Sequence, residues 1–257
     1  KFVEAYRAEG VNLYAVHVQN EPNSCQVFPS CIWTSEALRD FIGKYLGPEF
    51  DKHQLNTDIW LGTIERPSVE KVDTVLTDSL ARRYVKGVGF QWAGRGAIAG
   101  VHFKYPAMKL MQTETECGNG SNDWDAAEHT WDLILHYLNN GANAYMYWNI
   151  VLDETGKSQW GWKQNSMISV NTQTGKSVLH PEYYLMKHLS HYVKPGSKRL
   201  RTEGSEDALA FVNPDGSKVM IVYNRNDTGK SFKIRFDDQS FRAHLNPKSF
   251  NTFFIKI

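Results

Sequence analysis

The sequence VNLYAVHVQNEP (residues 11–22) joins an apolar, β-branched run over 11–19 to the polar group Asn20-Glu21-Pro22. Such a run predicts a buried strand that ends in a loop. Similar apolar runs follow it in DIWLGT (58–63), VGFQW (88–92), MKLMQT (108–113) and ANAYMYW (142–148). The sequence therefore predicts five strands of one sheet.

Amphipathic segments alternate with these strands. The stretch TSEALRDFIGKYLGP (34–48) has a threonine cap, apolar residues at helical spacing and a stop at Gly47-Pro48. Further helices are expected over about 68–85, 125–140 and 181–193. Alternating strands and helices indicate an α/β fold with a parallel sheet. Five strands are too few to close an eight-stranded barrel, so we expect a partial (β/α)8 TIM barrel or an open sheet.

The pattern changes beyond Pro195-Gly196. Apolar residues alternate at period two, and turn signals occur at Pro214-Asp215-Gly216 and Asn226-Asp227. This pattern predicts a small antiparallel β-sandwich module. The predicted domains are therefore residues 1–195 and residues 196–257.

Composition excludes several functional classes. The 29 basic and 28 acidic residues leave a formal charge of +1, which gives no electrostatic reason to expect nucleic acid or an anionic membrane as partner. No apolar run approaches the roughly 20 residues of a transmembrane helix. The three cysteines lack zinc-type spacing. The spacing of Cys25 and Cys31 would allow a disulfide that closes a small loop, and the sequence does not decide whether it forms. Aromatic residues make up 13% of the chain, which suits sugar stacking, although most aromatic side chains serve in packing.

Two glutamates stand where strands are expected to end. Glu21 follows the first strand and Glu114 follows the fourth, at the edge where barrel enzymes carry their active sites. Two carboxylates there suit glycoside hydrolysis, in which one protonates the leaving oxygen and the other attacks or activates water. An arbitrary glutamate is more often a salt-bridged surface acid. The hydrolytic interpretation is favoured because Trp148-Asn149 stands at the end of a third predicted strand.

Four ordered motifs carry a family resemblance: QNEP (19–22), PSCIWTSEALRDFIGKYLGP (29–48), QTETECGNG (112–120) and AYMYWNIVLDETGKSQWGWKQNSMI (144–168). Together they resemble glycoside hydrolase family 30, which includes glucosylceramidases and endo-β-1,6-glucanases. The resemblance implies a (β/α)8 barrel with a β-sandwich, of which this chain would hold about strands 4–8 and the C-terminal part of the sandwich. We interpret the sequence as an N-terminally truncated fragment, and expect the isolated fragment to be inactive.

The resemblance also implies residue roles. Glu21 would be the general acid/base and Glu114 the nucleophile, with Glu116 as its rival, and Asn20 would contact the sugar 2-hydroxyl. Further substrate-binding residues implied are Gln91, Trp92, Trp148, Trp160 and Trp162, of which the last two are also open to simple loop packing. No metal or other cofactor is implied.

The function expected is that of a retaining β-glycosidase acting by double displacement on a β-glucoside or β-glucan. A xylan-directed hydrolase of the same family and a non-catalytic carbohydrate-binding fragment are the alternatives. A secreted or periplasmic location is expected, with carbohydrate or sphingolipid metabolism as the setting. The glycines at Gly94, Gly96 and Gly100 have the wrong spacing for a dinucleotide-binding loop.

Overall fold

A computed structural model describes residues 1–236 and 239–256 of the chain. The chain forms two compact units, which are described separately. The first comprises Lys1–Glu116 and His136–Trp148, and the second comprises Cys117–Leu135 and Asn149–Ile257. Residues 237, 238 and 257, which belong to the predicted C-terminal module, lie outside the described residues.

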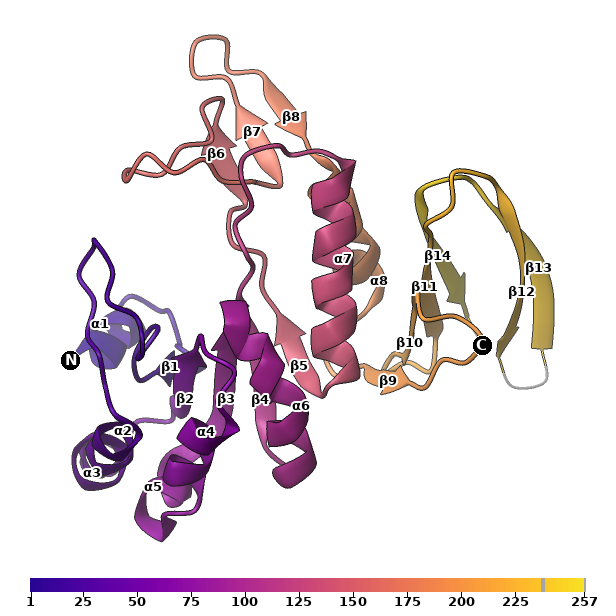
Figure 1. Cartoon of the computed structure of the whole chain (residues 1–257). Coiled ribbons are helices and arrows are strands. Elements are labelled where there is room, and N and C mark those ends of the chain that lie inside the picture. The colour runs from indigo at the N-terminus through magenta and orange to yellow at the C-terminus, as the bar shows by residue number, and fades with distance from the viewer. Residues whose placement is uncertain (237–238, 257) are drawn as a thin grey trace. The chain divides into compact units, whose positions relative to one another are not determined.

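A five-stranded parallel sheet with the order β1-β2-β3-β4-β5 forms the centre of the first unit (Figure 1). Its strands are β1 (Ala15–His17), β2 (Asp58–Ile64), β3 (Val85–Gln91), β4 (Lys109–Glu114) and β5 (Ala142–Tyr145). Each strand pairs in parallel with the next along the chain. The predicted α/β class and the five parallel strands are therefore confirmed.

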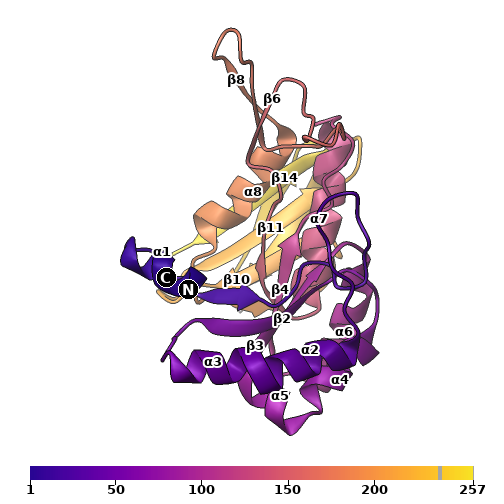
Figure 2. The ribbon, with the colours of Figure 1, turned by 90° about the vertical axis from the view of Figure 1, so that its left-hand side faces the viewer.

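Helices α2 to α6 cover one side of this sheet (Figure 2). The helical elements of the unit are α1 (Phe2–Ala8), α2 (Ser35–Phe41), a π-helical turn (Ile42–Leu46), α3 (Gly47–Lys52), α4 (Val69–Leu76), α5 (Ser79–Tyr84) and α6 (Arg95–Lys104). Their fully buried side chains, such as Leu38, Val72 and Ile98, form one core with Leu61 and Val88 of the sheet. Burying each such side chain contributes about 1.5–3 kcal/mol, which fixes the sheet against the helices.

The predicted helix over 34–48 is longer than expected. The helical chain passes through the π-helical turn and continues as α3 to Lys52 instead of stopping at Gly47-Pro48. Pro48 stands at the start of α3, directly after the π-helical turn, within a chain that is helical on both sides of it. A Cβ at Gly47 would lie 2.2 Å from the Tyr84 ring, so this glycine permits close packing of the helix and does not end it.

Two other helical predictions are corrected. The segment 68–85 is two helices, α4 and α5, because Asp78 caps a new helix by accepting a hydrogen bond from Ala81 N (2.8 Å). Residues 95–104, for which no helix was predicted, form α6. The first strand was expected to be buried, but β1 pairs only with β2 within the described sheet and is half-buried.

Pairing between β1 and β2 continues past the end of β1. Val18 N donates to Trp60 O, Gln19 N to Gly62 O and Glu21 N to Thr63 O of β2, each at 3.2 Å. Gly62 has a φ of 103° beside an irregularity in the β2–β3 register, a conformation that glycine adopts without strain. The backbone of Glu21 is thus held beside the carboxyl end of β2.

The second unit contains the antiparallel sheets. Its elements are β6 (Val151–Asp153), β7 (Ile168–Val170), β8 (Ser177–Leu179), α8 (Pro181–Tyr192), β9 (Lys198–Leu200), β10 (Ala208–Val212), β11 (Lys218–Asn224), β12 (Lys230–Phe236), β13 (Gln239–Leu245) and β14 (Ser249–Ile255). Helix α7 (Trp124–Asn139) contributes residues to both units. Strands β14-β11-β10-β9 form one sheet and β12-β13 another, which confirms the predicted antiparallel module. The small sheet of β6, β7 and β8 was not predicted.

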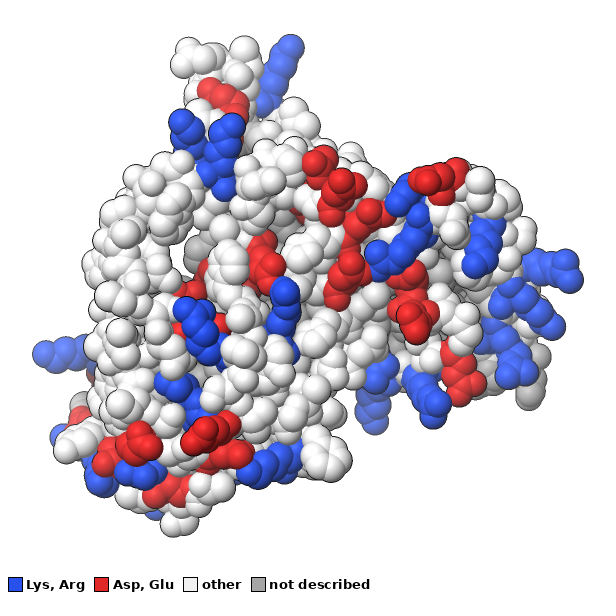
Figure 3. Space-filling view, viewed as in Figure 1, with Lys and Arg blue, Asp and Glu red and all other residues white. Residues whose placement is uncertain are grey.

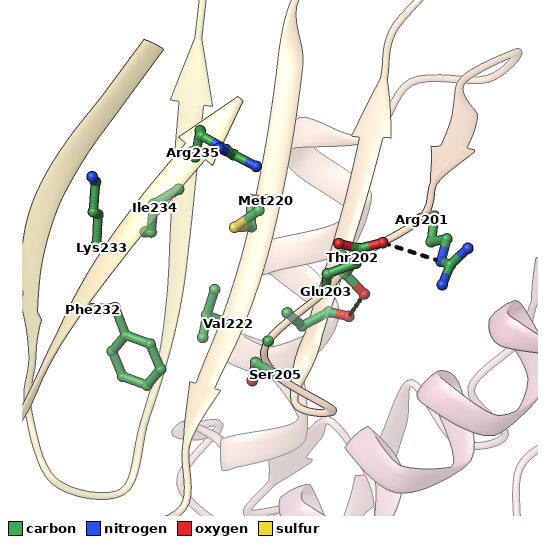
Figure 4. A pocket seen from close by; sticks show the side chains of 12 residues that line it. Arg201, Thr202, Glu203, Ser205, Met220, Val222, Phe232, Lys233, Ile234 and Arg235 are labelled. Atoms are coloured by element: carbon green, nitrogen blue, oxygen red, sulfur yellow. Dashed lines mark hydrogen bonds and ion pairs between the residues drawn. The ribbon is translucent and has the colours of Figure 1, made fainter. Parts of the chain in front are cut away.

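A cavity of about 390 Å³ lies between β11 and β12 in this unit. Met220 and Val222 of β11 and Phe232 and Ile234 of β12 line it from facing strands (Figure 4). Lysine and arginine side chains cover the outer part of the β12–β13 hairpin (Figure 3), a feature that discourages pairing of sheets between molecules. Glu203 is the one carboxylate among the described lining residues, so the cavity lacks the paired acids of a hydrolytic site.

Candidate active site

Glu21 is held by its backbone in a conformation that glutamate rarely adopts. Its φ is 48°, in the left-handed region. Its N–H donates to Thr63 O (3.2 Å), and its carbonyl accepts a hydrogen bond from Ser24 N (3.0 Å). The residue is buried, yet Gln26 Nε2 reaches its Oε2 atom at 3.0 Å. A strained backbone that its surroundings hold in place is common at functional sites.

Glu114 is the last residue of β4, and two donors reach its carboxylate. Trp92 Nε1 donates to Oε1 at 3.0 Å, and Gln91 Nε2 donates to Oε2 at 3.2 Å. Burial raises the pKa of Glu114 above the usual value for a glutamate, and the negative charge of Glu21 raises it further. The hydrogen bonds from Trp92 and Gln91 oppose this by lowering the pKa.

One side-chain amide connects the two acids. Gln91 Nε2 donates both to Glu21 Oε1 at 3.0 Å and to Glu114 Oε2 at 3.2 Å. Thr113 Oγ1 contacts Gln91 Oε1 at 3.3 Å, which turns the amide nitrogen toward the carboxylates. Because both hydrogen bonds start from the same nitrogen, the distance between Glu21 Oε1 and Glu114 Oε2 cannot exceed the sum of the two bond lengths. That limit is compatible with the separation of about 5–5.5 Å that retaining glycosidases require.

Comparison with known proteins identifies the family. Residues 1–193 match the model of the glycosyl hydrolase family 30 TIM-barrel domain, and residues 196–253 match that of the glycosyl hydrolase family 30 beta sandwich domain. The chain belongs to glycoside hydrolase family 30. The resemblance predicted from the four motifs is therefore confirmed.

Individual relatives of this family 30 chain are named as glucosylceramidases, and a solved structure similar to it is that of an endo-beta1,6-glucanase. Putative glucosylceramidase 1 of Caenorhabditis elegans is 30% identical over 88% of this chain and 48% of the relative. Lysosomal acid glucosylceramidase of Mus musculus is 26% identical over 96% of this chain and 52% of the relative. The structure of the endo-beta1,6-glucanase BT3312 superposes with a TM-score of 0.87 and 25% identity, covering 98% of this chain and 61% of that one. The chain thus spans about half the length of the curated relatives it matches.

Glu116, the rival of Glu114, is engaged differently. Its Oε1 atom forms an ion pair with Arg95 Nη1, at the start of α6. A carboxylate bound by a guanidinium is stabilised as an anion and is a weaker nucleophile for it. The amide of Gln91 reaches Glu114, so this family 30 chain brings Glu114 and not Glu116 to Glu21 through a shared donor.

The remaining predicted site residues are divided between the two units. Asn20, adjacent to Glu21, is exposed, and its Oδ1 accepts a hydrogen bond from Thr63 Oγ1 (2.9 Å). Trp148 is 47% exposed, three residues past the end of β5. Trp160 and Trp162 are exposed in the loop between β6 and β7 of the second unit. Hydrogen bonds to the acids are observed for Gln91 and Trp92. The sugar-binding roles of all six residues stay predictions.

The thiols and other potential ligand groups add no second site. Cys25 and Cys31 form no disulfide with each other, so the small loop closure that the sequence leaves undecided is not formed. Over residues 1–236 and 239–256 there is no cluster of three or more His, Cys, Asp or Glu side chains arranged to hold a metal ion. No helix in the same ranges has both the length and the apolar character needed to cross a membrane.

Sequence reasoning missed three residues that shape the site. Gln26 binds Glu21, Thr113 orients Gln91, and Glu65 binds the loop that follows Glu21. Glu65 comes directly after β2, so the strand-end argument that selected Glu21 and Glu114 would also have selected it. Gln26 and Thr113 carry no comparable signal in the sequence.

Proposed function

We propose that this family 30 chain is the acid-bearing part of a retaining β-glycosidase that hydrolyses β-glucosidic bonds. The observation that carries the proposal is the amide of Gln91, which donates to both Glu21 and Glu114 and so holds the two carboxylates within hydrogen-bond reach of one nitrogen atom. Hydrolysis with retention needs two carboxyl groups about 5–5.5 Å apart, one as nucleophile and one as acid/base.

The proposed reaction has two steps. A Glu114 oxygen attacks the anomeric carbon and forms a glycosyl ester, while the bond to the leaving oxygen breaks and Glu21 gives that oxygen its proton. Water then enters, Glu21 removes a proton from it, and the oxygen of this water displaces Glu114 from the anomeric carbon. The enzyme returns to its starting protonation state.

The surroundings of the two acids support these roles. Burial and the negative charge of Glu21 raise the pKa of Glu114, and the hydrogen bonds from Trp92 and Gln91 oppose this rise. An indole N–H can only donate, so the bond from Trp92 Nε1 stabilises the ionised carboxylate of Glu114, the form in which it attacks.

The proposed substrates are glucosylceramide and β-1,6-glucan, after the printed names of the relatives. Trp148 would lie beneath the sugar at the bond that is cleaved, and Asn20 would contact its 2-hydroxyl. A location outside the cytoplasm stays a prediction.

The test uses the protein that carries this chain, expressed from its complete reading frame. It should release glucose or glucan fragments from glucosylceramide or β-1,6-glucan with retention of the β-anomer, as followed by proton NMR. Activity on glucuronoxylan alone would contradict the proposed substrate class. Sugar binding without turnover of any of the three substrates would favour the carbohydrate-binding alternative.

The nucleophile is tested by trapping. A 2-deoxy-2-fluoroglucosyl fluoride should label the peptide that contains Glu114, as seen by mass spectrometry. Glu114→Gln should lower kcat by several orders of magnitude while sugar binding persists, and the matched variant Glu116→Gln should keep much of the rate. Labelling of Glu116, or a reversal of these rates, would place the nucleophile at Glu116.

A further inference from the structure

We propose that Glu65 is a positioning residue for acid catalysis: it holds the loop after Glu21 so that the Glu21 carboxylate faces the leaving oxygen. This inference rests on the proposed function, because it concerns the acid/base step. Glu65 does not contact Glu21 through its own side chain in any described hydrogen bond; it acts through Asn23 and Ser24.

Glu65 follows β2 directly and is fully buried, with 0% of its surface exposed. Its carboxylate accepts three hydrogen bonds from the loop after β1. Oε1 accepts from Asn23 N (2.8 Å) and Ser24 Oγ (3.0 Å), and Oε2 accepts from Asn23 Nδ2 (3.1 Å). Burying a carboxylate costs free energy unless the carboxylate is well hydrogen-bonded. The hydrogen bonds with Glu65 therefore favour the loop position in which Asn23 and Ser24 can donate to it.

The far end of the same loop is held by Lys71, which interacts with the negative charge of Glu65. Lys71, at the buried start of α4, donates from Nζ to Trp33 O (3.1 Å), and Trp33 N donates to Pro22 O (2.8 Å). Burial lowers the pKa of Lys71, and the negative charge of Glu65 opposes that effect. Glu65 and Lys71 therefore anchor the two ends of the segment from Pro22 to Trp33.

The loop transmits this anchoring to Glu21. Ser24, whose hydroxyl is bound to Glu65, donates its backbone N–H to Glu21 O at 3.0 Å. The left-handed φ of 48° at Glu21 is unfavourable for a residue that carries a side chain, and it persists only when neighbouring contacts enforce it. Loss of the Glu65 contacts would allow this backbone to relax and turn the Glu21 side chain away.

A merely structural role for Glu65 would have a different signature from a positioning role. A misplaced general acid slows cleavage when the leaving group needs a proton, and has little effect when the leaving group departs readily as an anion. Partial unfolding lowers the active fraction and so reduces both rates by the same factor. The ratio of the two rates separates the two explanations.

The experiment compares wild type with Glu65→Gln in the protein expressed from its complete reading frame. Gln keeps the shape of the side chain but replaces one carboxylate oxygen by an NH2 group, which faces either the backbone N–H of Asn23 or Asn23 Nδ2, so that a donor faces a donor. The substrates are methyl and 2,4-dinitrophenyl β-glucoside, or the corresponding β-gentiobiosides if wild type needs a longer sugar. We expect kcat/KM to fall about 10–100-fold for the methyl glycoside, within the range of general acid catalysis. For the dinitrophenyl glycoside we expect a change below about threefold.

A second readout is azide, which should raise turnover of the dinitrophenyl glycoside by Glu65→Gln and yield the β-glycosyl azide. Azide needs no general base, so it replaces the water that a displaced Glu21 activates poorly. Wild type should not respond. The matched control is Glu128→Gln, which removes a carboxylate bound by Tyr223 and Lys248 in the second unit and should leave the ratio of the two rates unchanged.

The outcomes are distinguishable. If wild type hydrolyses neither glycoside nor the polymeric and lipid substrates, the proposed function fails. If wild type is active and Glu65→Gln lowers both rates equally, or lowers neither, the positioning role is overturned. If Glu65→Gln does not fold, Ser24→Ala decides, because it removes one of the three bonds: a smaller selective loss on the methyl glycoside supports the proposal, and an unchanged ratio overturns it.

Discussion

Replacing Trp92 by phenylalanine should raise the pKa of Glu114. The substitution keeps an aromatic ring but removes the indole N–H that donates to Glu114 Oε1 at 3.0 Å. This bond stabilises the ionised carboxylate and lowers its pKa against the effect of burial. Without it, the protonated form gains population at any given acidic pH, so the pKa moves upward.

The size of the shift follows from the strength of the lost bond. A hydrogen bond to a charged group contributes about 1.5–3 kcal/mol. One pKa unit corresponds to about 1.4 kcal/mol, so the full range would be about one to two units. Gln91 still donates to Oε2 in the variant, and Glu114 is only half-buried, so we expect the lower end, about one unit.

The assay is the pH dependence of kcat/KM, whose acidic limb reports ionisation of the free enzyme. If Glu114 must be ionised to attack, the limb should move to higher pH by about one unit in Trp92→Phe. The matched control is Trp33→Phe, because Trp33 Nε1 is buried and has no hydrogen-bond partner within the described residues. Its limb should stay at the wild-type position. An unmoved limb in Trp92→Phe, or one displaced to lower pH, would refute the assignment of the acidic limb to Glu114.

Two further predictions concern packing beneath the site. A Cβ at Gly94 would lie 1.9 Å from Ile64 O, so Gly94→Ala should displace the chain next to Trp92 and lower both the melting temperature and kcat/KM. The control is Gly100→Ala, whose Cβ would meet only the side chain of Val69 and which should lower kcat/KM far less. Equal effects of the two substitutions would contradict this reasoning. Leu61→Ala should reduce the free energy of unfolding by about 2–5 kcal/mol in urea titrations, because Leu61 is fully buried. Leu80 is half-exposed, so Leu80→Ala should change the free energy of unfolding by less than about 1 kcal/mol. Similar losses for both variants would show that Leu61 does not belong to the stabilising core.

The parallel sheet could be predicted because each strand is a short apolar run rich in β-branched or aromatic residues. Helix ends were harder to predict, because Gly47-Pro48 ends a helix only where no neighbouring element packs against the glycine. Here Tyr84 lies so close to Gly47 that no side chain fits, and the helix continues past Pro48 after a π-helical turn. The contact with Tyr84 depends on a tertiary neighbour that local sequence does not reveal.

The same distinction separates the predicted and the missed parts of the site. Glu21 and Glu114 could be placed at strand ends from the apolar runs that precede them. The partners of Glu65 are Asn23 and Ser24, 42 and 41 residues earlier, and this pairing follows from the register between β1 and β2. The bridging role of Gln91 depends likewise on the irregular register that sets it beside Glu114. Registers of this kind are properties of the folded sheet.

Backbone strain explains why the acids need so many neighbours. Five described residues other than glycine have a positive φ, and two of them are Glu21 and Trp92, with values of 48° and 46°. Glycine would adopt these conformations without strain, but it would remove the proposed acid at one position and the indole donor of Glu114 at the other. The strain must therefore be offset by contacts from neighbouring strand ends. Thr63 and Ser24 supply them for Glu21, and a well-placed carboxylate at Glu65 keeps Ser24 in position.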